Sequence, residues 1–216
     1  MNIDEFKNLT QEDIHQMFDI KDPIVIKEVI KLIDQPGLHK MTDDENPVVR
    51  YEVASRIDQS GLHKMINDKN LAVRWVVTQR IDQAGLHKMI DDLELRVRQE
   101  VVKLIDQSGL HKMTDDASSV VRRVVIQRIN QEGLHKMFND PDSRMRLKVV
   151  RRIDQSGLHK MINDGDINVR AEVAKRIDQP GLHKMMNDKS PIIKEILASR
   201  LNQLSLHKID EESKLN

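Results

Sequence analysis

A strict internal repeat constrains the fold of this chain more than any other feature. Eight copies of a 24-residue repeat cover residues 17–208 without insertion when each copy is numbered from its first residue, as in Met41–Lys64. Such a period is typical of stacked structural modules rather than of two globular domains. The repeats are marked by Gly-Leu-His-Lys beginning at Gly37, Gly61, Gly85, Gly109, Gly133, Gly157 and Gly181, and by Ser-Leu-His-Lys at Ser205.

The first part of each repeat has the pattern of an amphipathic helix. Apolar residues recur at positions 9, 13 and 17, which are Val49, Val53 and Ile57 in the second repeat. A spacing of four places them on one helix face, whereas a half-buried strand would alternate every two residues. Position 6 carries capping residues such as Asn46, and position 7 is proline in three repeats, such as Pro47. The pattern predicts a main helix of about three turns over positions 7–17.

A second, shorter helix is predicted to follow. Position 18 is Asp or Asn throughout, which is typical of a helix N-cap, and Leu62 and Met65 would form the buried side. Gly61 would let the backbone approach its neighbour closely. We expect an α or 3₁₀ helix over position 19 to position 2 of the next repeat. Because one repeat cannot bury its own apolar face, the repeats must stack.

The expected organisation is therefore an all-α solenoid of about eight helix pairs. Residues 1–16 resemble a degenerate repeat and are expected to form an N-terminal capping helix. Residues 17–208 would form the solenoid. The polar residues 209–216 are expected to form a fraying tail.

The spacing of Asp, Val-Arg and Leu resembles that of the leucine-rich repeat variant family over residues 17–208. This resemblance implies alternating α and 3₁₀ helices wound into a right-handed superhelix without strands. Members of that family can carry a cysteine-rich iron–sulfur segment, but this chain has no cysteine, so no cofactor is expected. The pattern occurs as Asp44…Val49-Arg50…Leu62, Asp68…Val73-Arg74…Leu86 and Asp164…Val169-Arg170…Leu182.

Composition and motifs favour a binding protein over an enzyme. The 35 Lys and Arg residues balance the 35 Asp and Glu residues, so no overall charge draws the chain to nucleic acid or to an acidic membrane. The sequence has no His-Glu-x-x-His, Gly-x-Ser-x-Gly or phosphate-binding glycine motif. No apolar run reaches the ~18–20 residues of a membrane span, and the acidic N-terminus does not resemble a secretory signal. We expect a cytoplasmic protein with no catalytic activity and no small-molecule substrate.

Aspartate at position 4 and arginine at position 10 vary together. The first repeat replaces both charges, with Ile20 and Ile26. We expect each aspartate to form a structural ion pair with the arginine of its own repeat, tying the turn to the following helix. An arginine ladder that binds anions is the alternative. The predicted pairs are Asp44/Arg50, Asp68/Arg74, Asp92/Arg98, Asp116/Arg122, Asp140/Arg146 and Asp164/Arg170.

Two further recurring residues have structural and functional interpretations. Arginine at position 16, such as Arg56, lies beside the apolar face, so its stem is expected to cover the core while its head reaches water. All nine histidines fall on the repeat. Zinc needs three or four ligands around one ion, and each repeat supplies one imidazole, so we expect no metal site. A metal-responsive or pH-responsive histidine ladder is the open alternative.

Binding specificity should lie where the repeats differ. Position 11 points away from the apolar face, and its residues include the only Trp and the only Tyr of the chain. Exposed Trp, Tyr and Arg are typical of interface anchors. We expect a macromolecular-interaction scaffold that binds another protein through Tyr51, Trp75, Gln99, Arg123 and Leu147.

The alternative function is anion or nucleic-acid binding by repeats 5 and 6. Residues 120–152 contain nine Lys or Arg residues and three Asp or Glu residues. Some of these residues stand at positions that recur from repeat to repeat and are assigned structural roles. The additional ones are Arg123, Arg144, Lys148 and Arg151, which together form a candidate basic patch.

Overall fold

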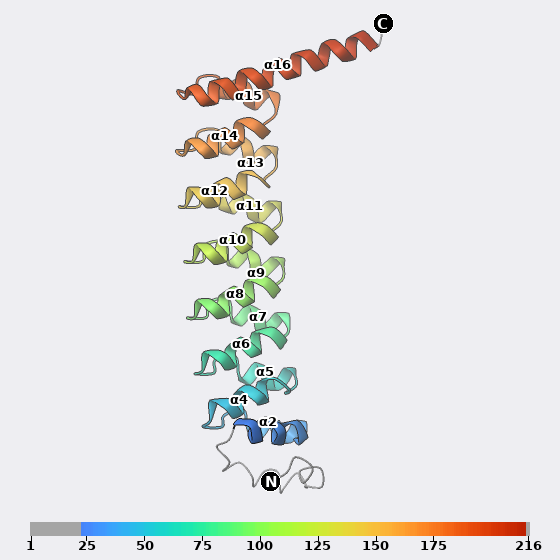
Figure 1. Ribbon diagram of the computed structural model, residues 1–216, viewed down its shortest axis with the longest axis vertical. Coiled ribbons are helices and arrows are strands. Elements are labelled where there is room, and N and C mark those ends of the chain that lie inside the picture. Colours follow the sequence, from blue (N-terminus) through green and yellow to red (C-terminus); the bar gives the residue numbers. More distant parts are fainter. Residues whose placement is uncertain (1–22, 215–216) are drawn as a thin grey trace. The chain divides into compact units, whose positions relative to one another are not determined.

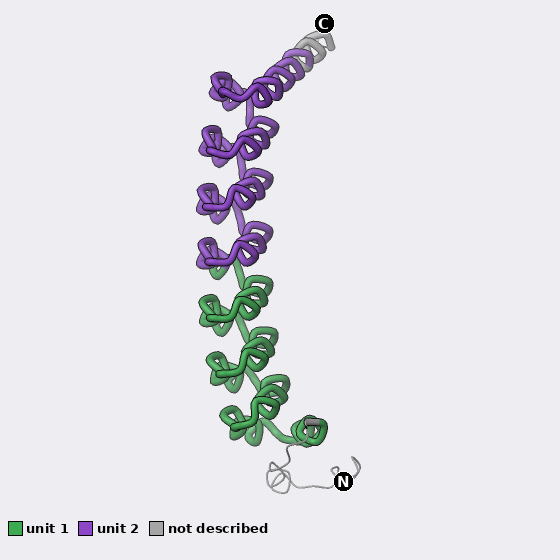
Figure 2. The backbone as a smooth tube through the Cα atoms, turned by 60° about the vertical axis from the view of Figure 1, so that its left-hand side comes forward, with its two compact units in different colours: residues 1–109 green, residues 110–216 purple. Residues whose placement is uncertain are grey.

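The computed structural model describes residues 23–214, and this part of the chain is helical with no strand. The capping helix expected at residues 1–16 lies outside the described residues. The chain divides into two compact units, residues 1–109 and 110–216 (Figure 2). The division falls inside α9 (Gln107–Lys112). Both units consist of stacked helix pairs, as the repeat predicts.

Unit 1 stacks four main helices in chain order (Figure 1). Each main helix packs against the next, and a short helix connects one to the other. The main helices are α2 (Pro23–Leu32), α4 (Pro47–Ala54), α6 (Leu71–Arg80) and α8 (Leu95–Leu104). The short helices that connect them are α3 (Gln35–Lys40), α5 (Gln59–Lys64) and α7 (Gln83–Lys88).

Unit 2 repeats this arrangement and ends in a long helix. Its main helices are α10 (Ser119–Arg128), α12 (Ser143–Val150) and α14 (Ile167–Arg176). Its short helices are α11 (Gln131–Met137), α13 (Gln155–Lys160) and α15 (Gln179–Met185), and the chain continues as α16 (Pro191–Lys214). Successive main helices pack together, with α16 against α14 and α15.

The predicted helix starts are confirmed at both capping positions. Asn46 accepts a hydrogen bond from Val48 N at 2.9 Å, and Asp58 accepts one from Gly61 N at 2.9 Å. These bonds satisfy backbone donors that the first helical turn leaves without an intrahelical partner. The short helices described are α-helical, not the 3₁₀ helices that the family resemblance implies.

The predicted core is also confirmed. Val73, Val77 and Leu86 are at most 2% exposed, like their equivalents in other repeats. Gly61 permits this packing, because a Cβ atom there would overlap the Ile57 side chain and lie 3.1 Å from Cε1 of His39. The close approach therefore involves both the same repeat and the preceding one.

The eighth repeat departs from the predicted helix pair. It forms the single 24-residue helix α16 instead of a main and a short helix. Ser205 replaces the repeat glycine, and a side chain at that position would collide with residue 17 of the repeat in the broken-helix geometry. Residues 209–214, expected to fray, belong to this helix.

Candidate interaction surfaces

The arginines at position 10 pair with the aspartate of the next repeat, not with that of their own. Nε of Arg50 lies 2.7 Å from Oδ2 of Asp68, and its Nη2 lies 3.0 Å from Oδ1. This two-pronged bond raises the pKa of Arg50, since Asp68 favours its charged form. Nη1 donates instead to the main-chain carbonyl of Asp44 at 2.6 Å. The prediction that the Asp44 carboxylate pairs with Arg50 is therefore wrong.

The same correction applies to the other predicted pairs. Arg98, expected to pair with the Asp92 carboxylate, donates from Nη1 to the Asp92 carbonyl at 2.8 Å and to the Leu93 carbonyl at 3.3 Å. The Asp92 carboxylate is bound by Arg74 of the preceding repeat, whose Nε lies 2.7 Å from Oδ2. In every such repeat the arginine reaches the carbonyl of its own aspartate. The predictions Asp68/Arg74, Asp92/Arg98, Asp116/Arg122, Asp140/Arg146 and Asp164/Arg170 are wrong in this way.

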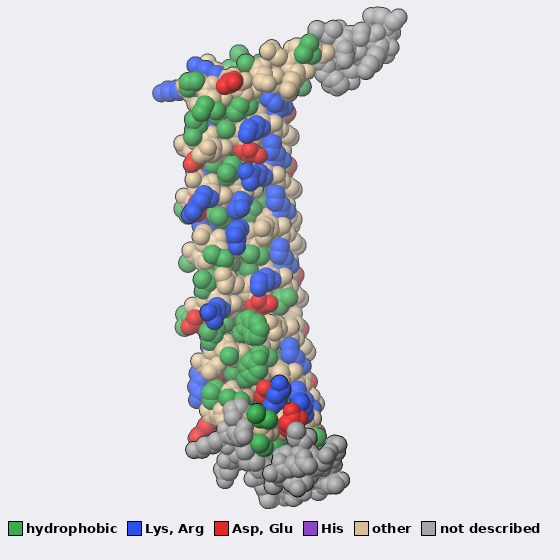
Figure 3. All heavy atoms as spheres, in the orientation of Figure 1, with side chains coloured by type: hydrophobic (Ala, Val, Ile, Leu, Met, Phe, Trp, Pro, Cys, Tyr) green, Lys and Arg blue, Asp and Glu red, His purple; other side chains and the backbone are tan. Residues whose placement is uncertain are grey.

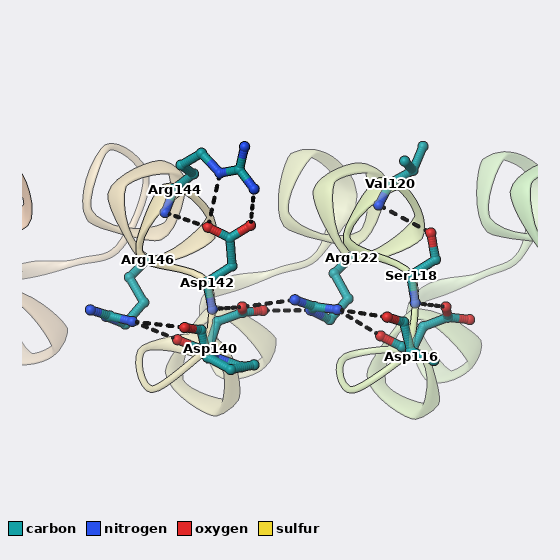
Figure 4. Close-up of polar contacts among 10 residues, drawn as sticks. Asp116, Ser118, Val120, Arg122, Asp140, Asp142, Arg144 and Arg146 are labelled. Carbon is teal, nitrogen blue, oxygen red and sulfur yellow. Dashed lines mark hydrogen bonds and ion pairs between the residues drawn. The ribbon is translucent and has the colours of Figure 1, made fainter.

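The same arrangement in unit 2 appears in Figure 4, where Arg122 reaches the carboxylate of Asp140 and Arg146 reaches the Asp140 carbonyl. The side chains of Arg122 and Asp140 are 9% and 2% exposed, so the pair is desolvated. A carboxylate so placed links two repeats and also accepts from the backbone of its own turn. The pairs are Arg50–Asp68, Arg74–Asp92, Arg122–Asp140, Arg146–Asp164 and Arg170–Asp188.

The expected pairing within one repeat is wrong because the bond to its own turn orients each aspartate toward the arginine of the preceding repeat, as Asp68 shows by accepting from both Asn70 N and Arg50. Oδ1 of Asp44 accepts from Asn46 N at 2.8 Å, which directs the carboxylate away from the following helix. The Asp44 carboxylate would be reached by an arginine at position 10 of the first repeat, but that position holds the buried Ile26. The shared replacement of Ile20 and Ile26 therefore does not report a pair within one repeat.

The Arg–Asp pairs are one tie, that is, a polar contact between neighbouring repeats. The glutamine at position 19 forms a second tie, which the sequence did not lead us to expect. The amide of Gln35 donates to the carbonyl of Arg56 at 3.2 Å, and its oxygen accepts from Asp58 N at 2.9 Å. Both partners lie in the next repeat. The signal was present, because position 19 is glutamine in all eight repeats. Equivalent bonds are made by Gln59, Gln83, Gln131 and Gln155.

Arginine at position 16 forms a third tie. Arg152 donates to the carbonyls of Ile126 and Ile129, where α10 ends in the preceding repeat. Arg200 makes the same contacts with the end of α14, at 3.1 Å to Ala174. The prediction that these heads reach water is therefore incomplete, because they cap the negative end of a helix dipole. In unit 1, Arg80 likewise donates to the carbonyl of Ala54, whereas the fourth repeat has Leu104 at this position, which is 40% exposed.

The histidines supply a fourth tie. Nε2 of His39 lies 3.0 Å from Oδ1 of Asp58, the N-cap of the next short helix. Hydrogen bonds from Gly61 N and then from His39 lower the pKa of Asp58 to about 2. Nε2 therefore donates to a carboxylate, while Nδ1 is buried with no hydrogen-bond partner in the described chain. Histidine is one more element of the contact between repeats.

Serine joins this histidine contact but is not activated by it. Ser60 Oγ donates to Asp58 at 2.9 Å and lies 3.4 Å from the same Nε2 of His39. A catalytic triad needs the carboxylate on one ring nitrogen and the serine on the other. Here both groups contact one nitrogen, which already carries the proton. Within the described residues, no three His, Cys, Asp or Glu side chains gather into a possible metal site.

The position-11 residues lie on the main helices, away from these ties. In unit 1, Trp75 is 37% exposed, and Tyr51 and Gln99 are half-buried on the neighbouring helices α4 and α8. Leu95 is 38% exposed and Leu71 is half-buried, at position 7 of their repeats. Figure 3 shows hydrophobic side chains gathered over α4 and α6. We call Tyr51, Leu71, Trp75 and Leu95 the aromatic surface.

Unit 2 carries positive charge on its main helices, with Arg123 at position 11 and the other cations at neighbouring positions. Lys and Arg side chains gather over α10, α12 and α14 (Figure 3). Nη2 of Arg144 lies 3.0 Å from Oδ2 of Asp142, and this contact lowers the pKa of the Asp142 carboxyl group. Nε of Arg151 lies 3.8 Å from Oε1 of Glu172. We call Arg123, Arg144, Lys148 and Arg151 the cationic surface. The half-buried Leu147 lies among them.

Comparison with solved structures identifies the fold. A leucine-rich repeat variant with a repetitive structural motif matches at a TM-score of 0.62 and 23% identity. The match covers 90% of this chain and 88% of that one. The two proteins share a fold. The expected leucine-rich repeat variant architecture is thus confirmed as a repeat of stacked helices.

Other comparisons are more distant. The Cnd3–Cnd2 subcomplex of S. pombe condensin matches at a TM-score of 0.41 and 16% identity, over 94% of this chain and 33% of that one. An engineered protein matches at 0.38 and 10% identity, over 94% and 77% of the two chains. No family model and no curated protein matches the sequence.

Proposed function

We propose that this protein is a non-catalytic scaffold that binds another protein through the exposed faces of its main helices. One observation carries the proposal: the polar residues that recur from repeat to repeat bind neighbouring repeats, whereas the position-11 residues vary and face outward. Arg50, Gln35 and His39 are each engaged by the next repeat. Trp75 is not used in this way and is 37% exposed.

The aromatic surface is the leading candidate for the contact. A Trp and a Tyr on adjacent helices offer a large apolar area with polar tips, and both residue types are enriched among interface residues that dominate binding energy. Leu71 and Leu95 extend this apolar area along the starts of α6 and α8. The surface thus has the composition of a protein-binding patch.

The cationic surface supports a second candidate function, the binding of an anion or a nucleic-acid backbone. Arg123 and Lys148 have no carboxylate within ion-pair distance among the described residues, so their charge is available. Affinity for a nucleic-acid backbone would fall steeply with salt, because binding releases condensed counterions. A protein partner held by the aromatic surface would be much less sensitive to salt.

We also place the protein in the cytoplasm. None of the helices described between residues 23 and 214 is long and apolar enough to cross a bilayer. The sequence supports this location through the absence of cysteine, which fits a reducing compartment.

Affinity capture from nuclease-treated extract, followed by titration of the captured protein, tests the proposal. We expect Tyr51→Ala/Trp75→Ala to weaken binding by about 30-fold or more, since two anchors are lost. Lys64→Ala/Lys88→Ala is the matched control, because both lysines are exposed on short helices of the same unit. Equal affinity of the two double variants for the captured protein would contradict the proposal.

A further inference from the structure

We propose that the cationic surface of unit 2 binds an acidic amphipathic segment of a partner protein, in which carboxylates flank apolar side chains. This inference rests on the proposed scaffold function and specifies the chemistry of one of its binding faces. Cations and apolar residues alternate on α10 and α12, and part of the positive charge there is unpaired among the described residues.

The alternation is built into the helix spacing. Leu147, Lys148 and Arg151 lie three, four and seven residues after Arg144, a spacing that places them on one side of α12 and of its C-cap, Arg151. On α10, which packs beside α12, Arg123 occupies the position equivalent to Leu147. Each apolar side chain therefore has cationic neighbours along its own helix or across to the next.

The row at position 8 shows the same alternation. Val120 on α10 is 38% exposed, and Arg144 holds the equivalent place on α12. In Figure 4 both side chains point to the side opposite Arg122 and Arg146, which bind aspartates between repeats. The surface is thus separate from the structural ion pairs, and its side chains are available to a partner.

The charge on this surface favours carboxylate partners. Asp142 neutralises part of the charge of Arg144, and Glu172 lies between Arg151 and Lys175 at 3.8 Å from each. Among the described residues, no carboxylate lies within ion-pair distance of Arg123 or Lys148. A guanidinium binds a carboxylate through two parallel hydrogen bonds, which gives such a contact direction as well as strength.

The apolar residues on this surface favour an acidic peptide over a nucleic acid as the partner. A phosphate backbone gains affinity from cations alone and would leave Val120 and Leu147 without apolar partners. Single strands also need aromatic platforms for their bases. The only aromatic residue of residues 110–216 is Phe138, which lines a cavity of about 430 Å³ with Asp140 and Lys160, at the turns that carry the ion pairs. A segment that combines acidic and apolar side chains matches both features of the surface.

The experiment measures fluorescence anisotropy of three labelled probes with the full chain. The probes are a short amphipathic peptide of glutamate and leucine, an oligoglutamate of equal length and a DNA duplex. We expect the amphipathic peptide to bind about tenfold or more tighter than oligoglutamate, because it also buries apolar surface. The duplex should bind most weakly at physiological salt.

Variants separate the two contributions. Leu147→Ser should weaken the amphipathic peptide by about tenfold and leave oligoglutamate unchanged, since it removes apolar contact only. Arg123→Ala/Lys148→Ala should weaken both peptides. Lys136→Ala is the control, because Lys136 is exposed on α11 and lies outside the surface. Circular dichroism confirms that each variant keeps its helices.

Two outcomes would overturn the inference. Duplex binding that is tighter than peptide binding and insensitive to Leu147→Ser would assign the surface to nucleic acid. Failure of all three probes, or equal binding of both peptides, would remove the acidic amphipathic partner. Neither outcome affects the proposed function, which fails separately if capture does not depend on Tyr51 and Trp75.

Discussion

Unit 1 and unit 2 share the same contacts between repeats but present different chemistry on their exposed helices. The Nε–Oδ2 distance is 2.7 Å both in Arg50–Asp68 of unit 1 and in Arg122–Asp140 of unit 2. At position 11, however, unit 1 has Trp75 and unit 2 has Arg123. The repeat thus keeps the residues that hold it together and varies the position-11 residues that we propose as the binding surface.

The two units also differ in how complete their ties are. In the fourth repeat, within unit 1, Leu104 replaces the arginine that Arg80 and Arg152 use to cap the preceding main helix. In unit 2, Asn130 replaces the N-cap aspartate, so His111 contacts an uncharged oxygen at 3.1 Å. These natural replacements serve as internal controls for the strength of each tie.

Loss of a buried ion pair should have the largest effect. Arg122→Leu would leave Asp140 charged and buried, which costs about 3–5 kcal/mol in the free energy of unfolding. Arg123→Leu, one residue along on the exposed side of the same helix, should change that free energy by about 0.5 kcal/mol or less. Denaturant unfolding of both variants measures the difference. Similar losses for the two would contradict the assignment of Arg122 to the tie.

Exchange of the position-16 residue between the units should have an intermediate effect. Leu104→Arg would let the fourth repeat form the cap that Arg152 forms in unit 2, and should raise stability by about 1–2 kcal/mol. Arg152→Leu should lower the stability of unit 2 by a similar amount. Amide hydrogen exchange of the preceding main helices measures both changes. Unchanged exchange in both variants would show that the arginine heads do not support the stack.

Acidification should have the smallest effect. It should distinguish the histidine contacts made to an aspartate, such as Asp154, from the contact made to Asn130. Hydrogen bonds from Gly157 N and then His135 lower the pKa of Asp154 to about 2, below its ordinary value of 3.8. Because the folded pKa is the lower one, this stabilisation is present above about pH 4 and is lost as pH falls through about 2. Asn130 does not titrate, so its bond to Gly133 N should persist.

The amide protons of Gly157 and Gly133 report this contrast within one unit. NMR titration should show the Gly157 signal shifting as pH falls from about 4 to about 2, and the Gly133 signal shifting far less. As a further check, Asn130→Asp should make Gly133 respond like Gly157. Parallel shifts of the two signals in the unaltered protein would mean that the aspartate does not control the cap.

Local signals in the sequence predicted most of the fold. The apolar spacing of Val49, Val53 and Ile57 and the caps at Asn46 and Asp58 depend on neighbours a few residues away, so the sequence reveals them directly. The structure places the position-11 residues on the main helices, as expected, with Trp75 exposed and Tyr51 half-buried.

Contacts between repeats were harder to predict because they depend on where a side chain reaches after stacking. Arg50 pairs with the carboxylate of Asp68, 18 residues further along the chain, and reaches only the main-chain carbonyl of Asp44. Gln35 likewise reaches Asp58 in the next repeat. The single helix α16 coincides with the replacement of the repeat glycine by Ser205, a change whose importance appears only once the packing around Gly61 is known.

Amide hydrogen exchange of the full chain with and without the captured partner tests most directly whether exposed main-helix faces bind while the ties only hold the fold. We expect the partner to slow exchange in α4, α6 and α8, or in α10, α12 and α14, and to leave exchange in α5, α7 and α13 unchanged. Protection confined to the short helices and their turns would contradict it.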